Sequence, residues 1–336
     1  MAIYKEIEYP KTQVKKAGRI FAGNSSPEAE REDALKIINN WRAAHAFPLQ
    51  IIYCNVKNKV PFSAIVAQRL KRLESITKKL ERFPNMSLST MQDIGGCRII
   101  VPTLEDVYVV ADKIAKSQWK HKFKEAYDYI KQPKSDGYRC YHMVYSYKSD
   151  KNSKYNGLFI EIQIRTNYQH LWATAVETMD EIDGQSLKTG NGSEVNGEFF
   201  RLTSLLLKEF EELGYSVEAV RNNGTVMRIR EFENENHILN RLSSIRATNN
   251  VIVSGNVNGY YLLKSDGKEQ TTDVEFYKKV VDATMAYERK EKERLPHQDV
   301  VLVSTSSIDA LKKAYPNYFS NVSDFVDTVN ELINEK

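Results

Sequence analysis

The alternation of apolar and polar residues is most regular over residues 158–165. The apolar residues occupy every second position: Leu158, Ile160, Ile162 and Ile164. The positions between them hold Phe159, Glu161, Gln163 and Arg165. Because successive side chains of a strand point to opposite faces of the sheet, this segment predicts a strand with one face on a core. Its other face is expected to lie against polar groups.

Helical and strand patterns follow one another through the first 220 residues. Helices are expected over residues 28–46, 61–83, 104–117, 168–181 and 198–213. Further buried strands are expected over residues 97–101 and 141–147. Pro61 begins the second of these helices and Pro84 ends it, as prolines often do at helix boundaries. Helical spacing predicts one polar stripe along that helix, formed by Lys71, Ser75, Lys78 and Arg82.

The pattern changes after residue 224. It predicts a helix around residues 233–245, a hairpin of residues 260–263 and 274–276, a charged helix ending before Pro296, a strand over residues 300–303 and two closing helices. This order is typical of an α+β fold, with a mixed β-sheet flanked by helices and a second, small α/β module. We expect a helical region over residues 1–60, a sheet domain over residues 61–224 and a C-terminal module over residues 225–336.

Composition agrees with a folded chain of two units. The 336 residues are 41% hydrophobic and 27% charged, which excludes collagen, a disordered tail and a membrane bundle. No run reaches the ~18 apolar residues that a membrane span needs, and the first residues lack the apolar segment of a signal peptide. A cytoplasmic protein without membrane contact is therefore expected.

The three cysteines, Cys54, Cys97 and Cys140, are far apart and have apolar or aromatic neighbours. That arrangement favours reduced core thiols over a disulfide framework. The sequence has no Cys-x-x-Cys pair, and residues 225–336 contain no cysteine at all. A zinc finger is therefore not expected in the C-terminal module.

Charge is distributed unevenly, although the net charge is only +4. Residues 120–154 carry nine Lys or Arg against four Asp or Glu, interleaved with six tyrosines. Basic side chains mixed with aromatic rings can hold phosphates and stack on bases. The alternative is a solvated edge of the sheet, and the charge pattern leaves both interpretations open.

Two carboxylates are candidates for a metal site. Asp93 precedes the turn Gly95-Gly96 into a buried strand, and Glu161 lies on the polar face of another strand. Mg²⁺ is typically held by one or two carboxylates together with substrate phosphates. Asp93 could instead cap its turn, whereas Glu161 would otherwise be an exposed sheet residue.

Cations near these carboxylates suit a polyphosphate. Arg69 lies beside the polar stripe of the expected helix, and a basic turn follows later in the chain. That turn contains Lys131, Lys134 and Arg139 around Pro133 and Gly137, with the ring of Tyr138 available for stacking. The alternative for the polar stripe is that it is a solvated face of the helix without a ligand.

Together these residues resemble the ordered motifs of the RelA/SpoT nucleotide pyrophosphokinase (alarmone synthetase) domain. The motifs are Arg69-Leu-Lys71-Arg-Leu-Glu-Ser75-Ile-Thr-Lys-Lys79, Asp93-Ile-Gly-Gly-Cys-Arg98-Ile, Asp128-Tyr-Ile-Lys-Gln-Pro-Lys134-Ser-Asp-Gly-Tyr138-Arg-Cys-Tyr-His142 and Glu161-Ile-Gln163-Ile-Arg165-Thr. The resemblance covers roughly residues 60–185. The histidine-rich hydrolase domain of the long family members has no counterpart, since only His45 precedes His121. Synthesis without hydrolysis is implied.

The resemblance implies transfer of the ATP β,γ-pyrophosphate to a ribose 3′-hydroxyl. It assigns ATP binding to Arg69, Lys71, Ser75, Lys78, Lys79 and Arg98. It assigns Mg²⁺ to Asp93 and Glu161, with Glu161 as the base and Gln163 orienting the acceptor. It assigns acceptor binding to Lys131, Lys134, Tyr138, Arg139 and His142, with Tyr138 stacked on the acceptor base.

The acceptor side departs from the family pattern. Many small alarmone synthetases continue with a Glu-His and a Tyr-Lys pair on the next helix, whereas this helix reads His170-Leu-Trp-Ala-Thr-Ala-Val-Glu177. Part of the basic lining near the acceptor phosphates is therefore missing. This weakens the case for GDP or GTP and favours the CCA end of tRNA as the acceptor.

The tail Leu311-Lys-Lys-Ala-Tyr315-Pro-Asn-Tyr318-Phe resembles that of CapRel-type fused toxin-antitoxin proteins, which act against phage. In that branch a pseudo-zinc-finger module with a Tyr-x-x-Tyr motif closes the nucleotide site until a phage protein, typically a capsid protein, binds. The resemblance implies that Tyr315 and Tyr318 occupy the adenine-binding surface. The expected protein is an autoinhibited toxin that modifies tRNA and stops translation.

Two alternatives remain open. One is a constitutive synthetase that makes (p)ppGpp or (p)ppApp, which chromatography of the products distinguishes from a tRNA-modifying enzyme. The other is a catalytically inactive module that binds RNA or a partner protein. The presence of Asp93, Tyr138, Glu161 and Gln163 disfavours the inactive module.

Overall fold

The computed structural model describes residues 4–23, 26–183, 194–221, 224–243, 248–251, 258–266, 269, 271–295, 298–315, 318 and 322–334. Its centre is one twisted mixed sheet whose nine strands follow the order β3-β4-β5-β2-β1-β9-β7-β8-β6. The strands are β1 Ile65–Leu70, β2 Gly95–Val101, β3 Lys122–Asp128, β4 Tyr141–Ser146, β5 Phe159–Thr166, β6 Thr248–Val251, β7 Gly259–Asp266, β8 Thr271–Tyr277 and β9 Gln298–Thr305. The predicted α+β class with a mixed sheet is therefore confirmed.

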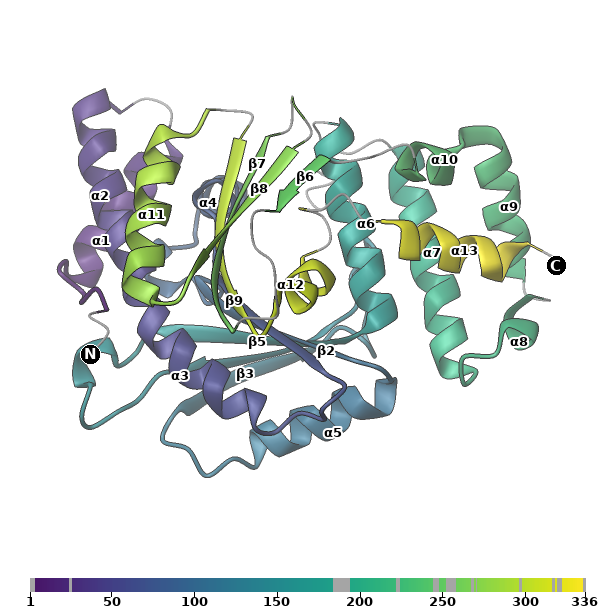
Figure 1. The fold of residues 1–336 in the computed structure, drawn as a ribbon, viewed down its shortest axis with the longest axis horizontal. Coiled ribbons are helices and arrows are strands. Elements are labelled where there is room, and N and C mark those ends of the chain that lie inside the picture. Colours follow the sequence, from purple (N-terminus) through teal and green to yellow (C-terminus); the bar gives the residue numbers. More distant parts are fainter. Residues whose placement is uncertain are drawn as a thin grey trace.

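Helices cover the sheet and form a bundle beside it (Figure 1). They are α1 Lys11–Ala22, α2 Glu28–Ala44, α3 Ala46–Lys57, α4 Leu73–Arg82, α5 Leu104–Ala115, α6 Asn167–Asp183, α7 Glu194–Glu212, α8 Val217–Arg221, α9 Gly224–Asn236, α10 Ile238–Ser243, α11 Val280–Glu293, α12 Ile308–Ala314 and α13 Ser323–Ile333. In the described part of the chain no helix is both long and apolar enough to cross a membrane.

Strand β5 confirms the alternation that the sequence shows. Ile160, Ile162 and Ile164 are fully buried in a core that helices α3 and α5 complete on one face of the sheet. Burial of such side chains is the main stabilising contribution of this layer. The intervening Glu161 and Gln163 lie on the other face, where α6 and α12 pack.

The last third of the chain joins this sheet directly. Strand β9 pairs antiparallel with β1, opposing Val303 to Arg69, and β7 and β8 continue the sheet beyond it. The short helix α12 packs against β1 and β9 and lies near the middle of the molecule (Figure 1). The chain then returns through α13, which packs on α6, α8, α9 and α10 in a separate helical core.

The helix predicted over residues 61–83 is wrong in its first half. Residues 65–70 form β1, and α4 begins only at Leu73. Strand β1 is hydrogen-bonded on both sides, to β2 and to β9, so pairing with distant strands overrides the helical spacing of this segment. Lys71 therefore lies in the turn before α4, and the predicted polar stripe is broken there.

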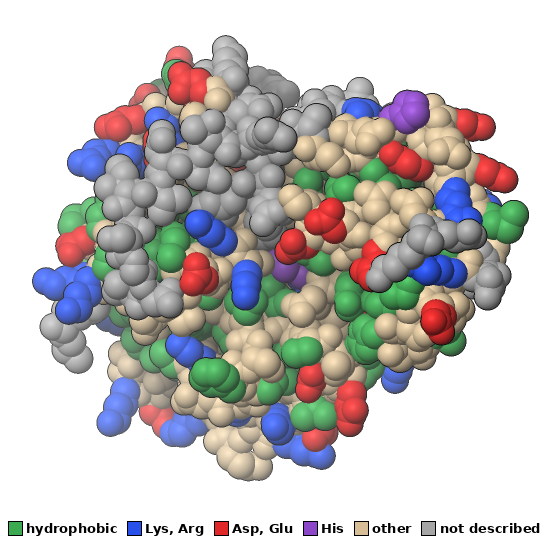
Figure 2. Space-filling view, turned by 45° about the vertical axis from the view of Figure 1, so that its right-hand side comes forward, with side chains coloured by type: hydrophobic (Ala, Val, Ile, Leu, Met, Phe, Trp, Pro, Cys, Tyr) green, Lys and Arg blue, Asp and Glu red, His purple; other side chains and the backbone are tan. Residues whose placement is uncertain are grey.

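Other differences are local. The expected helix around residues 233–245 is two helices, α9 and α10, separated at His237, whose φ of 51° interrupts the helical backbone. Cys97 and Cys140 are buried as predicted, but Cys54 is exposed. Positive and negative side chains are interspersed over the face drawn in Figure 2, so this side presents no extended area of one charge.

Candidate active site

The polar face of the sheet carries a row of facing side chains. In the strand register, Tyr127 on β3 is opposite His142 on β4, and His142 is opposite Gln163 on β5. Gln163 is in turn opposite Arg98 on β2. Residues that are opposite one another in a sheet share a face. One row therefore runs from the β3 edge of the sheet to its middle.

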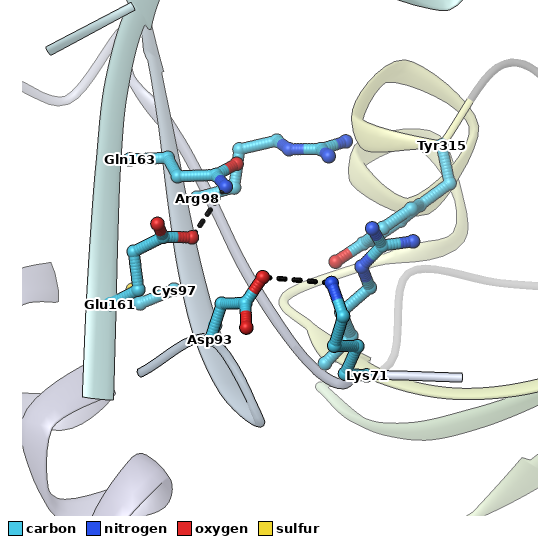
Figure 3. A pocket seen from close by; sticks show the side chains of 9 residues that line it. Lys71, Asp93, Cys97, Arg98, Glu161, Gln163 and Tyr315 are labelled. Atoms are coloured by element: carbon cyan, nitrogen blue, oxygen red, sulfur yellow. Dashed lines mark hydrogen bonds and ion pairs between the residues drawn. The ribbon is translucent and has the colours of Figure 1, made fainter. Parts of the chain in front are cut away.

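A second row lies beside the first and contains the candidate base. Glu161 on β5 is opposite Gly96 on β2, and Gly96 is opposite Arg69 on β1. Gly96 has no side chain, so the space between Glu161 and Arg69 stays open. Both rows contribute to one pocket, which is lined by Arg69, Lys71, Asp93, Gly96, Cys97, Arg98, Glu161, Gln163 and Tyr315 (Figure 3).

Asp93 lies at the entrance to β2 and is held by two lysines. Its Oδ2 accepts from Lys71 Nζ and from Lys79 Nζ, each at 2.8 Å. Burial favours the neutral acid, but these two cations outweigh burial and hold the pKa of Asp93 well below its ordinary value. The carboxylate is charged at neutral pH. Its second oxygen, Oδ1, is buried and has no hydrogen-bond partner in the described structure.

Glu161 is fixed at both carboxylate oxygens. Oε1 lies 2.9 Å from Nδ1 of His142, and Oε2 accepts from Nε2 of Gln163 at 2.7 Å. Burial pushes the pKa of Glu161 upward, but His142 outweighs burial and holds this pKa below its usual range. His142 is the other member of the pair. Burial lowers its pKa, but Tyr138 and Glu161 outweigh burial and raise this pKa well above its ordinary value. The two groups form a charged pair inside the site.

Tyr138 connects this pair to the basic turn. Its hydroxyl lies 2.9 Å from Nε2 of His142, so the imidazole joins Tyr138 to Glu161. Lys134 lies over the rings of both Tyr138 and Tyr129, at 5.0 and 4.5 Å from their centroids. The turn that the sequence predicts thus places an aromatic face and a cation next to the carboxylate.

The carboxyl end of α12 fills the opposite side of the pocket. Tyr315 is only 1% exposed, and its ring lies 5.2 Å from the guanidinium of Arg98 and 5.8 Å from that of Arg69. Arg98 Nη1 donates to the carbonyl of Ala314 at 2.9 Å. Arg98 points toward α12 in Figure 3, and both arginines are engaged by this helix end.

Further contacts hold α12 and Tyr318 in place. His170 Nε2 donates to the carbonyl of Lys313 at 2.7 Å, while Nδ1 of the same ring accepts from Arg165. Tyr318 lies over Arg72 and donates its hydroxyl to Asp299 at 3.1 Å. The buried surroundings and Arg165 hold the pKa of His170 well below its ordinary value, so the ring is neutral.

Nine predicted site residues do not line the pocket. Lys79 and His142 contact its carboxylates, Tyr138 and Lys134 follow His142 outward, and Tyr318 lies beyond Tyr315. The other four lie apart from the pocket. Lys78 pairs with Glu74 on the exposed side of α4, and Ser75 on the same helix does not line the pocket. Lys131 is exposed and lies 3.9 Å from Asp128. Arg139 is buried 2.5 Å from Glu211, which removes its charge from the acceptor side.

Sequence reasoning missed three residues that support the site. Arg42 on α2 donates to the carbonyl of Lys71 at 3.0 Å and also binds the hydroxyl of Tyr287 on α11. In the sequence, His170 stands out only as part of a helix that departs from the family pattern, and that gives it no role. No local signal could reveal Arg42, because Tyr287 is 245 positions away in sequence. Across the described residues, no cluster of three or more His, Cys, Asp or Glu could hold a metal ion.

Comparison with known proteins identifies the segment that supplies every lining residue of this pocket except Tyr315. Residues 68–179 match the family model described as "Region found in RelA / SpoT proteins". Over 118 residues the chain is 34% identical to GTP pyrophosphokinase YjbM of Bacillus subtilis, covering 34% of this chain and 55% of that protein. It is 36% identical over 102 residues to a GTP pyrophosphokinase of Haemophilus influenzae, covering 30% of this chain and 12% of the relative.

Among solved structures, small alarmone synthetase 1 from Bacillus subtilis bound to its product pppGpp aligns with a TM-score of 0.44 and 24% identity. That alignment covers 52% of this chain and 93% of the other. The matched segment spans about half the length of YjbM and a smaller share of the long relatives. Residues 68–179 thus match the region found in RelA/SpoT proteins, and the predicted resemblance to this domain is confirmed.

Proposed function

We propose that this protein is an ATP-dependent pyrophosphokinase whose acceptor is the 3′-hydroxyl of a nucleotide or of tRNA. The observation that carries the proposal is one pocket that joins Asp93 and Lys71 to Glu161 and Gln163, four residues of the segment that matches RelA/SpoT proteins. The relatives' name, GTP pyrophosphokinase, supports the reaction type.

The cations of the pocket suit a triphosphate. Lys71 and Lys79 contact Asp93, and Arg69 and Arg98 lie on the neighbouring strands. We assign these four side chains to the ATP phosphates and adenine. Most of the rate in phosphoryl transfer comes from positioning and charge neutralisation, and this group of cations supplies both.

The donors present suit a divalent cation such as Mg²⁺. Asp93 keeps one buried oxygen without a partner, and Glu161 lines the same pocket. One or two carboxylates plus substrate phosphates form the usual Mg²⁺ site of such enzymes. When bound, the ion would neutralise charge on the transferring phosphates.

Glu161 is the proposed general base. It removes the proton of the acceptor 3′-hydroxyl, the 3′-oxygen bonds to the β-phosphorus of ATP, and the bond between that phosphorus and the α,β-bridging oxygen breaks. AMP leaves with that oxygen, and the proton stays on Glu161. His142 and Gln163 hold the carboxylate in place for this step, since each contacts one of its oxygens.

We propose the CCA end of tRNA as the acceptor, with its terminal adenine stacked on Tyr138. The acceptor side offers few free cations, because Arg139 is neutralised by Glu211. This supports an acceptor without a 5′-diphosphate. GDP or GTP is the second candidate, since the relatives are named GTP pyrophosphokinases.

The contacts of α12 support an autoinhibited state. Tyr315 and the carbonyl of Ala314 occupy the two arginines that ATP would need. A partner protein that binds the C-terminal module and prefers the open state would release the site. A phage capsid protein is the partner that the resemblance implies, and arrest of translation is the expected consequence.

The test is an incubation of the full chain with γ-labelled ATP, Mg²⁺, tRNA, GDP and GTP, followed by separation of RNA from nucleotides. Label on tRNA that disappears with Glu161→Gln supports the proposal, and Lys78→Gln is the matched control outside the pocket. Label on guanosine nucleotides alone would make the protein an alarmone synthetase. Transfer to no acceptor, with Tyr315→Ala as well, would refute enzymatic activity.

A further inference from the structure

Three tyrosine rings form a continuous series that leads away from the reaction centre. The ring centroids of Tyr138 and Tyr129 are 6.2 Å apart, and those of Tyr129 and Tyr127 are 5.7 Å apart. The last two rings are nearly parallel, with an interplanar angle of 4°. We call these three residues the aromatic track.

The inner end of the track touches the proposed chemistry. The hydroxyl of Tyr138 contacts His142, which contacts Glu161. Tyr129 also packs edge-on against His142, with centroids 5.3 Å apart. A base stacked on Tyr138 would therefore have its ribose near the carboxylate. Tyr129 is as close to His142 as Tyr138 is, so the track leaves the reaction centre at Tyr127.

The outer end of the track lies at an open edge. Strand β3 is the first strand of the sheet, and among the described strands it pairs with β4 alone. Tyr127 on this strand is 40% exposed. A ring that served only to fill a core would be covered, whereas Tyr127 presents a face to solvent beside an already stacked neighbour.

Lys134 gives the track a cation that suits a phosphate. Its ammonium lies over two of the three rings and forms no ion pair within the described residues. Two carboxylates flank the outer part of the track and are held by neutral donors: Glu125 accepts from the hydroxyl of Tyr127, and Asp128 accepts from the backbone of Ile130 and Lys131. A free ammonium next to stacked rings can contact the phosphate between two stacked bases.

We infer that the aromatic track binds the bases that precede the acceptor nucleotide, and that its ligand is the 3′ end of a single-stranded RNA. This inference rests on the proposed function, since it takes Tyr138 as the stacking site of the terminal base. A mononucleotide would reach Tyr138 alone and gain nothing from Tyr127. The track thus distinguishes an RNA end from a free nucleotide.

The strand itself supplies a matched control. The pairing of β3 with β4 shifts register between Phe123 and Glu125, so the side chain of Phe123 lies on the opposite face of the sheet from that of Tyr127. There Phe123 pairs with Tyr145, and the centroids of the two rings are 5.6 Å apart. Phe123 is 56% exposed, and so resembles Tyr127 in chemistry and exposure. Only its face differs.

The experiment measures the fluorescence anisotropy of a 5′-labelled single-stranded oligoribonucleotide ending in CCA, titrated with the full chain. Stacking of one base contributes about 1–3 kcal/mol, so Tyr127→Ala should weaken binding by about 5- to 150-fold. Tyr127→Phe keeps the ring and should bind as the unsubstituted protein does, and so should Phe123→Ala. Equal loss in Tyr127→Ala and Phe123→Ala, no loss in either, or no binding of the oligonucleotide would overturn the inference.

A second readout separates this inference from the proposed function. With labelled ATP, Tyr127→Ala should raise the KM for the oligonucleotide and leave its kcat and the KM for GDP unchanged. Oligonucleotide binding that depends on Tyr127, without any transfer of label even when Tyr315→Ala is also present, would support the track and refute the pyrophosphokinase. Transfer to the oligonucleotide with an unchanged KM would support the enzyme and refute the track.

Discussion

At the scale of single residues, the candidate base is defined by its partners more than by its own type. Glu161 would be an ordinary mid-strand carboxylate without His142 and Gln163, which fix its two oxygens. His142 also sets the charge of the carboxylate, because it outweighs burial and holds the pKa of Glu161 below its usual range. His142 is thus a positioning residue for the proposed proton transfer.

Substitution of His142 by glutamine should move the acid limb of the pH–rate profile. Activity needs the Glu161 carboxylate, so it is lost as the pH falls through the pKa of this group. Without the imidazolium, burial and the charge of Asp93 outweigh the hydrogen bond from Gln163 and raise that pKa, so the limb shifts to higher pH. The measurement is kcat against pH, with His121→Gln as control, and an unmoved limb in His142→Gln would contradict the assigned role.

At the scale of elements, the carboxyl end of α12 is the proposed autoinhibitory part of the chain. It offers the carbonyls of Lys313 and Ala314 to His170 and Arg98, and it covers Arg69 and Arg98 with Tyr315. Each cation–π contact contributes about 0.5–2 kcal/mol. A few such contacts are enough to favour the closed state, and they are weak enough for a binding partner to overcome.

Removal of the Tyr315 ring should therefore tighten ATP binding. Loss of two cation–π contacts uncovers Arg69 and leaves Arg98 only its hydrogen bond to the Ala314 carbonyl, so the affinity of Tyr315→Ala for ATP should rise about tenfold. Tyr315→Phe keeps the ring over both guanidinium groups and should bind ATP as the unsubstituted chain does. Isothermal titration calorimetry measures both, and equal affinity in all three proteins would show that α12 does not compete with ATP.

A fall in pH should weaken the attachment of α12 to the site. The pKa of His170 is held well below its ordinary value of 6.5 in the closed state, so protonation requires its release from the buried position. Stabilisation of the closed state by neutral His170 is complete above pH 6.5 and declines as the pH falls below it. Arg165, Arg98 and Glu177 are the charged groups that face the ring.

The ratio of ATP affinities between the unsubstituted protein and His170→Gln measures this effect, because the titration of ATP itself cancels in the ratio. Gln retains a donor for the Lys313 carbonyl but cannot be protonated in this range. The ratio should favour the unsubstituted protein increasingly as the pH falls from 8 to 5.5. A ratio independent of pH would exclude His170 as a source of pH dependence.

The elements also show what the sequence could reveal. Strand β5 could be predicted because its alternation is local and one of its faces is buried along its length. Strand β1 could not, because its partner β9 is more than 220 positions away and only the pairing makes residues 65–70 extended. Asp93 and Glu161 were found from their motifs, whereas the burial of Arg139 depends on Glu211 in a distant helix.

At the scale of the whole molecule, the two ends of the chain are built into one structure. The β9–β1 pairing continues the sheet from the RelA/SpoT region into the last third of the chain. Arg42 joins α2, the turn at Lys71 and Tyr287 of α11. In the helical bundle, Phe325 of α13 stacks 6.1 Å from Phe200 of α7. A change near the C-terminus should therefore affect distant elements.

Phe325→Ala tests this connection. Phe325 is 1% exposed, and loss of a buried ring typically costs about 3–5 kcal/mol of unfolding free energy. The loss should increase hydrogen exchange in α7 as well as in α13, because both helices share this core. Asp327→Ala, on the exposed face of α13, is the control and should change neither. Faster exchange confined to α13 would contradict a shared core.

The most direct test of the whole account is pyrophosphate transfer by the full chain carrying Tyr315→Ala. With γ-labelled ATP, Mg²⁺ and tRNA, this variant should label the RNA faster than the unsubstituted protein does. Addition of Glu161→Gln to the same variant should lower the rate by about 10²-fold or more, as expected for loss of a general base. Labelling that is no faster in Tyr315→Ala, or that persists after Glu161→Gln, would contradict a site that α12 closes and Glu161 operates.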